Sequence, residues 1–251
     1  MVGVQASHQL EDGLIVRLRH EHRQHHKTKL RKFRRGLFRD VVDNVVSFFQ
    51  QGTHIKKKGM KNIIDYIKIA QAIEHYKSAG FKYLNVDWAV KPESVRITTP
   101  PHCRIHKLNS KALVGSAEQS FLHMMMFENL QPDRYVAATP CFRDDMVDDL
   151  HSTYFFKVEL IDFLNVESDY QTKQSLNAII EMCQIFFEKF LKTEIVQTED
   201  LNWDIVDAEH GIELGSYGIR SHERYKWIYA TGIAEPRLST VISHQYRPIV
   251  K

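Results

Sequence analysis

Segments with helical and with strand-like spacing of apolar residues follow one another along this chain in an order that limits its fold. Helical spacing marks residues 8–50, 62–78, 116–126 and 174–191, and a last helix is expected from about residue 237. Strand-like spacing marks residues 81–90, 94–98, 111–114, 134–143, 153–164, 203–207, 211–214, 219–221 and 225–231. This order lacks a regular β-α-β alternation. It predicts an α+β fold, an antiparallel β-sheet flanked by helices.

Local signals support several of these boundaries. The apolar stretches 134–143 and 153–164 are joined by the acidic loop Asp144–Asp149, which predicts a β-hairpin. Gly80 follows helix 62–78 at a position where glycine commonly ends a helix. Ser116 is expected to cap the next helix, with Gln119 completing a capping box.

Composition excludes several classes of protein. No run of about 18 apolar residues is present, so no membrane-spanning helix is expected, and the first residues lack the apolar core of a secretory signal. The chain has 3 cysteines, Cys103, Cys141 and Cys183, which are widely separated. Neither a disulfide framework nor a zinc ribbon is indicated, and a reducing, cytoplasmic compartment is expected.

Positive charge is concentrated near the start of the chain. Residues 17–39 carry ten lysines and arginines, with Glu21 as the acidic residue among them, although the net charge of the whole chain is only +3. We therefore expect two parts, a basic helical N-terminal extension (residues 1–60) and a core (residues 61–251). Such a segment can bind a polyanion such as tRNA, form a dimer contact, or simply be solvated.

The same segment contains four histidines, at positions 20, 22, 25 and 26. No cysteine or carboxylate accompanies them at a spacing typical of metal sites, so a solvated basic helix is the favoured interpretation.

Three arginines lie where strands meet turns or helices. Arg143 follows Phe142 at the end of a predicted strand, Arg220 ends the sequence Gly-Ile-Arg, and Arg237 follows Glu235-Pro236. Because a guanidinium grips phosphate and carboxylate in a bidentate manner, the three indicate a site for an anionic nucleotide and an acidic small molecule. The alternatives are ordinary ion pairs, Arg143 with Asp145 or Arg220 with Glu213, and a helix-terminal Arg237 without function.

The order of these motifs resembles the catalytic core of class II aminoacyl-tRNA synthetases. Phe142-Arg143-Asp144-Asp145 is similar to their second signature, with Asp145 in place of glutamate, and His151-Ser152-Thr153-Tyr154-Phe155 is similar to the sequence that follows it. The segment from Gly232 to Leu238 resembles the third signature, with Pro236 at a position that is normally acidic or polar. Helix 62–78, Gly80 and Pro92 match the first signature only loosely.

Within that superfamily, the chain is most similar to the ammonia-dependent asparagine synthetases. Their Glu-Leu-Ser-Ser-Met-Gly-Ile-Arg segment resembles Glu213–Arg220, and their Leu-His-Ser-Val-Tyr resembles Leu150–Tyr154. The resemblance implies an AMP-forming ligase that uses ATP and Mg²⁺ to activate aspartate as an acyl-adenylate, which ammonia then converts to asparagine. It also implies a homodimer that pairs through the helix of the first signature.

The resemblance implies roles for individual residues on the nucleotide. Arg143 would hold the α-phosphate and the attacking carboxylate, and Arg237 the γ-phosphate. Glu213 would hold Mg²⁺, with Asp204, Asp207 or Glu209 as a second ligand. The remaining nucleotide-binding residues would be Asp145, His151 and Phe155, with Phe142 or Phe155 stacked on the adenine.

It implies a second set of residues on the acid. Arg220 would meet the carboxylate side chain of the substrate, beside Ser216. The α-amino group would be bound by Ser116, Glu118 and Gln119. A bidentate arginine–carboxylate pair contributes about 1.5–3 kcal/mol, enough to select an acid over a neutral analogue.

Two other functions stay open at this stage. The first is a synthetase paralogue that acts on tRNA or another acceptor, with residues 17–39 as its RNA-binding segment. The second is a catalytically silent synthetase-like protein that binds or regulates. The departures at Asp145 and Pro236 favour both alternatives, whereas the retention of all three arginines and Glu213 disfavours the silent protein.

Overall fold

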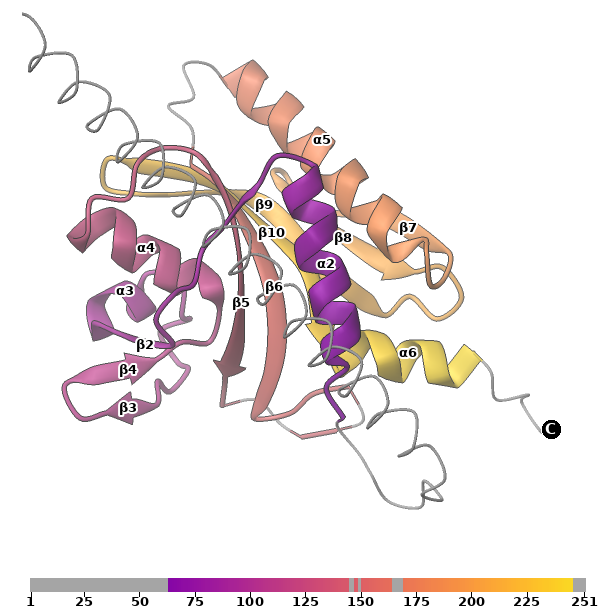
Figure 1. Cartoon of the computed structure of the whole chain (residues 1–251), viewed down its shortest axis with the longest axis horizontal. Coiled ribbons are helices and arrows are strands. Elements are labelled where there is room, and N and C mark those ends of the chain that lie inside the picture. The colour runs from indigo at the N-terminus through magenta and orange to yellow at the C-terminus, as the bar shows by residue number, and fades with distance from the viewer. Residues whose placement is uncertain (1–62, 145–146, 149, 164–168, 246–251) are drawn as a thin grey trace, which may run out of the picture. The chain divides into compact units, whose positions relative to one another are not determined.

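A seven-stranded, largely antiparallel sheet organises the computed structural model, which describes residues 63–144, 147–148, 150–163 and 169–245 (Figure 1). These residues belong to one unit, Met60–Lys251, and the expected extension 1–60 lies outside the described residues. The sheet order is β1 (Lys82–Tyr83), β5 (Arg134–Phe142), β6 (Tyr154–Asp162), β10 (Tyr225–Glu235), β9 (Glu213–His222), β8 (Asn202–Asp207) and β7 (Thr193–Glu199). Only β1 pairs in parallel, with β5. The α+β prediction is confirmed.

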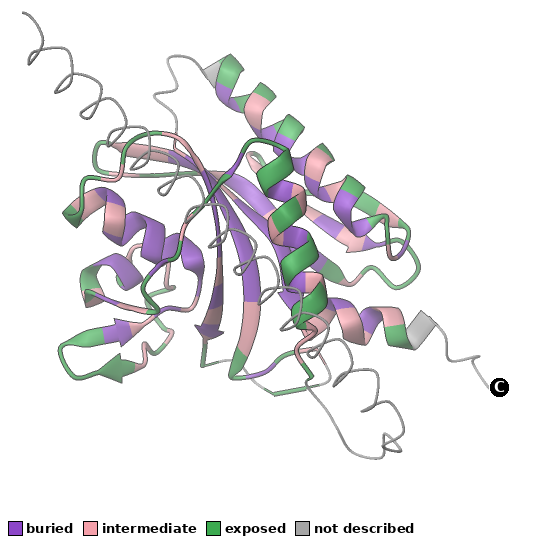
Figure 2. Cartoon of the chain, viewed as in Figure 1, coloured by how far each residue is buried: buried purple, intermediate pink, exposed green. Residues whose placement is uncertain are grey.

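Helices cover both faces of this sheet because its strands alternate their apolar residues. Along β5, Val136 faces a core that includes α2 (Tyr66–Ser78), α5 (Asp169–Phe187) and α6 (Arg237–Gln245). Its neighbours Tyr135 and Ala137 face a second core with α4 (Ala117–Phe127). Apolar residues repeat every second position in the strands and about every 3.6 positions in the helices. Helices can therefore pack on both faces of the sheet, which gives a three-layer arrangement. Figure 2 shows how completely the central strands are buried.

A small second sheet lies on the α4 side of the molecule. Its strands are β2 (Ala89–Val90), β4 (Lys111–Leu113) and β3 (Lys107–Leu108), in that order, and α3 (Pro92–Arg96) lies against α4 and β4. The hairpin of β3 and β4 is largely exposed (Figure 2).

The predicted hairpin is confirmed, since β5 and β6 pair from Arg134↔Asp162 to Phe142↔Tyr154. The helix signals are confirmed as well. Gly80, with φ +97°, follows the C-terminus of α2, and Ser116 is the N-cap of α4. Helix α2 begins at Tyr66, later than residue 62, because the Asp65 carboxylate accepts the backbone N–H groups of Ile67 and Lys68.

Several predicted elements differ, among them the strand expected at 81–90, of which only the short strands β1 and β2 near its two ends are found. The strand expected at 94–98 is wrong, because Pro92 and Glu93 start helix α3 there. The strands expected at 211–214 and 219–221 are one strand, β9, whose mixed burial hid its continuity. The sequence-based prediction also missed β7, an edge strand whose residues are nearly all exposed. Among the described residues no helix is long and apolar enough to span a membrane.

Candidate active site

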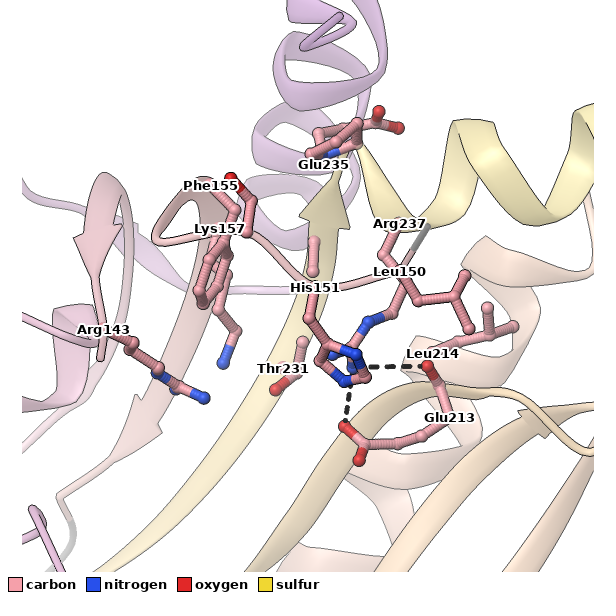
Figure 3. Close-up of a pocket in the computed structure, with 13 residues that line it drawn as sticks. Arg143, Leu150, His151, Phe155, Lys157, Glu213, Leu214, Thr231, Glu235 and Arg237 are labelled. Carbon is pink, nitrogen blue, oxygen red and sulfur yellow. Dashed lines mark hydrogen bonds and ion pairs between the residues drawn. The ribbon is translucent and has the colours of Figure 1, made fainter. Parts of the chain in front are cut away.

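Two adjoining hollows lie over the middle strands of the large sheet. The larger cavity, of about 380 Å³, is lined by the N-terminus of α4, the loop after α3, and parts of β5, β6, β9 and β10. The smaller pocket is lined by residues around Leu150–Phe155, Glu213–Leu214 and Ala234–Arg237 (Figure 3). Four residues line both hollows, namely Arg143, Lys157, Glu213 and Thr231. They define the junction of the site.

Arg143 reaches this junction from the end of β5. Its Nε donates a hydrogen bond to the carbonyl oxygen of Gly115 at 3.0 Å, and its guanidinium lies 5.1 Å from the ring centre of Phe155. Phe155, proposed from the sequence as an adenine contact, lines the smaller pocket. The alternative partner Asp145 lies outside the described residues, so the structure says nothing of that pair.

Arg237 and Glu213 meet in the smaller pocket. Arg237 follows Pro236 as the first residue of α6, and its Nη1 lies 3.2 Å from the Glu213 carboxylate (Figure 3). Glu213 begins β9 and also accepts from Arg237 through its carbonyl oxygen at 3.4 Å. His151 lines the same pocket, where it is paired with Asp148 at 2.8 Å.

The carboxylate of Asp204 is repelled by the negative charge of Glu213. Asp204 stands opposite Ser216 in the β8–β9 ladder, and Ser216 lines the larger cavity. Burial raises the pKa of Asp204, the charge of Glu213 raises it further, and a hydrogen bond from Ser216 opposes both. Of these two carboxylates, Glu213 lines both hollows and Asp204 lines neither. Mg²⁺ usually binds one or two carboxylates plus phosphate oxygens and water, so Glu213 is the carboxylate that could hold it here.

The other two metal ligands considered from the sequence lie elsewhere. The buried carboxylate of Asp207 accepts the backbone N–H groups of Glu209 and His210 and pairs with the His210 ring at 2.7 Å. It caps the turn between β8 and β9, and neither it nor Glu209 lines the cavity or the pocket. Within the described residues, no group of three or more His, Cys, Asp or Glu side chains is placed to hold a metal.

Arg220 lies in the larger cavity, but its partner is not Glu213. Its Nη1 contacts the Glu118 carboxylate at 2.5 Å, and its guanidinium lies 3.8 Å from the ring centre of Tyr229. The other oxygen of Glu118 accepts from Trp227 Nε1 at 2.7 Å. Burial raises the pKa of Glu118, while Arg220 and Trp227 counteract that rise. Glu118 and Arg220 thus form an anion and a cation side by side.

Ser116 and Gln119 line the same cavity, and the side chains of both make hydrogen bonds to neighbouring groups of the protein. Ser116 Oγ accepts from the Glu118 N–H at 3.1 Å as the cap of α4. Gln119 does not close the expected capping box on Ser116. Its Oε1 accepts from the N–H of Gly115 instead, and its Nε2 donates to Thr98, Thr99 and the carbonyl of Val95.

Lys157 and Glu159 are site residues that the sequence-based prediction missed. They are buried on β6, with their charged groups 2.6 Å apart. Two charged residues of opposite sign at i and i+2 in an otherwise apolar strand share one face of it, and that pattern is the signal that marks them.

Comparisons with known proteins agree with this fold. Residues 25–240 match the family model of the tRNA synthetases class II core domain. No curated protein matches by sequence. Among solved structures, the chain is similar to a cytoplasmic serine–tRNA ligase from Naegleria fowleri in complex with AMP (TM-score 0.59, 14% identity, 73% of this chain and 49% of that one).

Two further solved structures share the fold. They are a seryl-tRNA synthetase from Pyrococcus horikoshii complexed with ATP (TM-score 0.53, 18% identity, 70% and 49% covered) and a pyrrolysyl-tRNA synthetase, PylSc, from Desulfitobacterium hafniense (0.57, 13%, 86% and 80%). The chain spans about half the length of the two seryl enzymes (49% of each).

Proposed function

Since this chain belongs to the class II tRNA synthetase core family, we propose that it activates the carboxylate of an amino acid with ATP, forming an acyl-adenylate and pyrophosphate. The observation that carries the proposal is the junction between the two hollows. There Arg143 and Lys157 place two cations, with Arg237 and Glu213 on the side of the smaller pocket and Glu118 and Arg220 on the side of the larger cavity.

The reaction requires charge neutralisation more than a protein nucleophile. One oxygen of the acid attacks the α-phosphorus of ATP, the bond to the α–β bridging oxygen breaks, and pyrophosphate leaves with the bonding electrons. Negative charge builds on the phosphoryl oxygens, so arginines fixed before the reaction lower its barrier by electrostatic stabilisation and positioning. Arg143 suits the α-phosphate, and Arg237 suits the far end of the triphosphate. Bound Mg²⁺, held by Glu213, would supply further positive charge to the phosphates.

We propose aspartate as the acid. Arg220 and Glu118 offer adjacent opposite charges that match a carboxylate and the ammonium group of one amino acid. Binding would exchange one internal ion pair for two pairs with the substrate, so the buried site keeps its charge balance. If ammonia is the acceptor and asparagine the product, the side-chain carboxylate lies at the junction and Arg220 holds the α-carboxylate.

ATP–pyrophosphate exchange with Mg²⁺ tests this function. We expect aspartate, among the common amino acids, to support exchange. Arg237→Ala should abolish it, whereas Lys173→Ala, at an exposed position of α5, should leave it unchanged. Isoasparagine, whose free carboxylate is the side chain, should replace aspartate if that group is activated. Asparagine should replace it if the α-carboxylate is. Absence of exchange with every acid, in folded protein, would sink the proposal.

A second candidate acceptor, an RNA, is favoured by the charge around the cavity. Residues 91–111 contain five lysines and arginines, namely Lys91, Arg96, Arg104, Lys107 and Lys111, all exposed, against Glu93. Arg104 also lines the larger cavity. At the opposite end of the sheet, residues 193–223 contain eight acids and Arg220. A polyanion would approach from the side of β3 and β4, and the α-carboxylate would then be the group activated.

We also propose that two copies of the chain pair through α2. Its outer face exposes Tyr66 (59%) and Ile67 (57%), and Ile63 (47%) is exposed just before the helix; a second copy would cover these apolar side chains. Sedimentation velocity should show a dimer that Ile67→Lys converts to a monomer. A monomer at every concentration would contradict the pairing.

A further inference from the structure

Lys157 is a buried cation at the place where the two hollows meet. It is 8% exposed, lies on β6 between Phe155 and Glu159, and lines both the smaller pocket and the larger cavity. Among the described residues that line either hollow, it is the one lysine. Arg143 lines both hollows as well, and Figure 3 shows the two side chains extending from neighbouring strands.

Glu159 holds this ammonium in place. The carboxylate of Glu159 accepts from Lys157 Nζ at 2.6 Å, from Ser116 Oγ at 2.8 and 2.9 Å, and from the backbone N–H of Ala117. Ser116 caps α4 and Ala117 is its first residue, so the N-terminal end of that helix holds the Glu159 carboxylate. The carboxylate in turn holds the Lys157 ammonium. An ammonium has three N–H donors. With one directed at Glu159, others remain for a ligand.

Glu159 stays ionised although it is buried. Burial alone would raise its pKa, but the charge and hydrogen bond of Lys157, followed by Arg143 and Ser116, hold the pKa below its ordinary value. Glu159 is therefore an anion at neutral pH, and the ammonium that it holds is the cationic end of the pair, at the junction.

We propose that Lys157 is a further catalytic residue, which binds the attacking carboxylate and the α-phosphate oxygen at the junction, with Glu159 as its positioning residue. This inference rests on the proposed adenylation. Lys157 faces the acid from the strand next to Arg143, so the two cations flank the bond that forms between the carboxylate oxygen and phosphorus. The lysine offsets the repulsion between two anions before the attack and the charge that accumulates during it.

A purely structural role for Lys157 and Glu159 would predict a different result when the two residues are replaced. A buried ion pair is weak evidence for stability, because desolvation of the two charges offsets their attraction. The pair could then be replaced by neutral residues with little effect on anything but folding. At the junction, the same replacement should remove catalysis.

The test compares four variants by ATP–pyrophosphate exchange with aspartate, each checked for folding by thermal unfolding. Lys157→Gln should lower kcat on the order of 100-fold, with KM for ATP nearly unchanged, and Lys157→Arg should restore part of the loss. Glu159→Gln should lower kcat less, because the cation remains but is less well held. The double variant K157Q/E159Q leaves no unpaired buried charge, so it should fold yet stay as inactive as K157Q.

The outcomes separate this inference from the proposed function. Exchange in the wild-type protein together with near-normal kcat in the folded K157Q/E159Q protein would overturn the role of Lys157 alone. A loss confined to KM for ATP would also overturn it, because the lysine would then serve nucleotide binding only. No exchange in the wild-type protein would instead mean that adenylation itself fails.

Discussion

The guanidinium of Arg220 lies between an aromatic ring and a buried carboxylate. Tyr229 supports one face of it, and Glu118, from the first turn of α4, neutralises its charge. Glu118 is 6% exposed, so its ionised form depends on Arg220 and on the N–H of Trp227. The charge state of Glu118 therefore depends on residues that lie far from it in the sequence and close to it in the structure. Each one is both a binding group and a condition for the other's ionisation.

Replacing Arg220 by methionine should destabilise the protein by about 1–3 kcal/mol, less than for a fully buried pair because Arg220 is partly exposed. The folded-state pKa of Glu118 is already raised, and the variant raises it further. A raised carboxyl pKa makes stability fall as pH rises above the unfolded-state value. Urea unfolding should therefore show a larger loss at pH 8 than at pH 5.

The double variant E118Q/R220M supplies the control for that measurement. Because it removes the buried charge together with its partner, it should recover most of the stability and lose the additional pH dependence that R220M introduces. Equal losses for the single variant at both pH values would contradict the assigned role of Glu118.

The element that brings the site together is β10. It runs from Tyr225 to Glu235 between β6 and β9, and its register to β6 shifts between Thr231 and Ile233. Two buried tyrosines hold this irregularity, Tyr217 through the carbonyl of Thr231 and Tyr76 through the carbonyl of Gly232, each at 2.8 Å. A side chain at Gly232 would come within 2.5 Å of the Tyr76 ring, so glycine is required for that close approach. Beyond this bulge Glu235 ends the strand and Arg237 begins α6, and both residues line the smaller pocket.

Glu235 makes the junction of β10, α2 and α6 sensitive to pH. It is fully buried, and burial raises its pKa to about 7, against the smaller opposing effects of Ser239 and Lys68. The folded protein thus holds a proton that the unfolded chain releases near pH 4.5. Stability should fall as pH rises from about 4.5 to 7, by up to about 3 kcal/mol.

Glu235→Gln should remove this component. Urea unfolding between pH 5 and 8 should show a flatter profile for the variant and higher stability than wild type at pH 8. A profile parallel to that of the wild type would show that Glu235 does not carry the change.

At the scale of the molecule, charge is divided between the two ends of the sheet. The exposed module of α3, β3 and β4 is basic, and the strands β7 to β9 are acidic (Figure 1). The cavity opens between them and takes Arg104 from the basic side. Such a distribution guides a polyanion to one end of the molecule and repels it from the other.

The triple variant R104Q/K107Q/K111Q should weaken binding of unfractionated tRNA and reduce the slope of log affinity against log salt by about 2, since each lost phosphate contact removes about 0.7–0.9. The matched variant K173Q/K189Q/K192Q, with the same charge change on and after α5, should bind like wild type. Filter binding over a range of KCl concentrations measures both. If only R31Q/K32Q/R34Q weakens binding, RNA contacts the segment 17–39 instead of this module.

What this sequence determines by itself is local. The hairpin of β5 and β6, the Ser116 cap, the end of α2 at Gly80 and the class II motif order all rest on residues close together in the chain, where period, turn chemistry and capping act directly. The sequence did not reveal the exposed strand β7 or the short helix α3, because edge strands and helices of one turn show little periodicity of apolar residues.

The tertiary structure alone decided the partners of the charges. Arg220 lies 102 positions from Glu118 in sequence, and Ser116 lies 43 from Glu159, yet each pair is in contact, while the nearer Glu213 is taken by Arg237. Asp207 caps a turn through its hydrogen bond from the His210 N–H, and the charge of Glu213 raises the pKa of Asp204. An ion pair depends on distance and burial, and neither is fixed until helices and strands far apart in the chain have packed together.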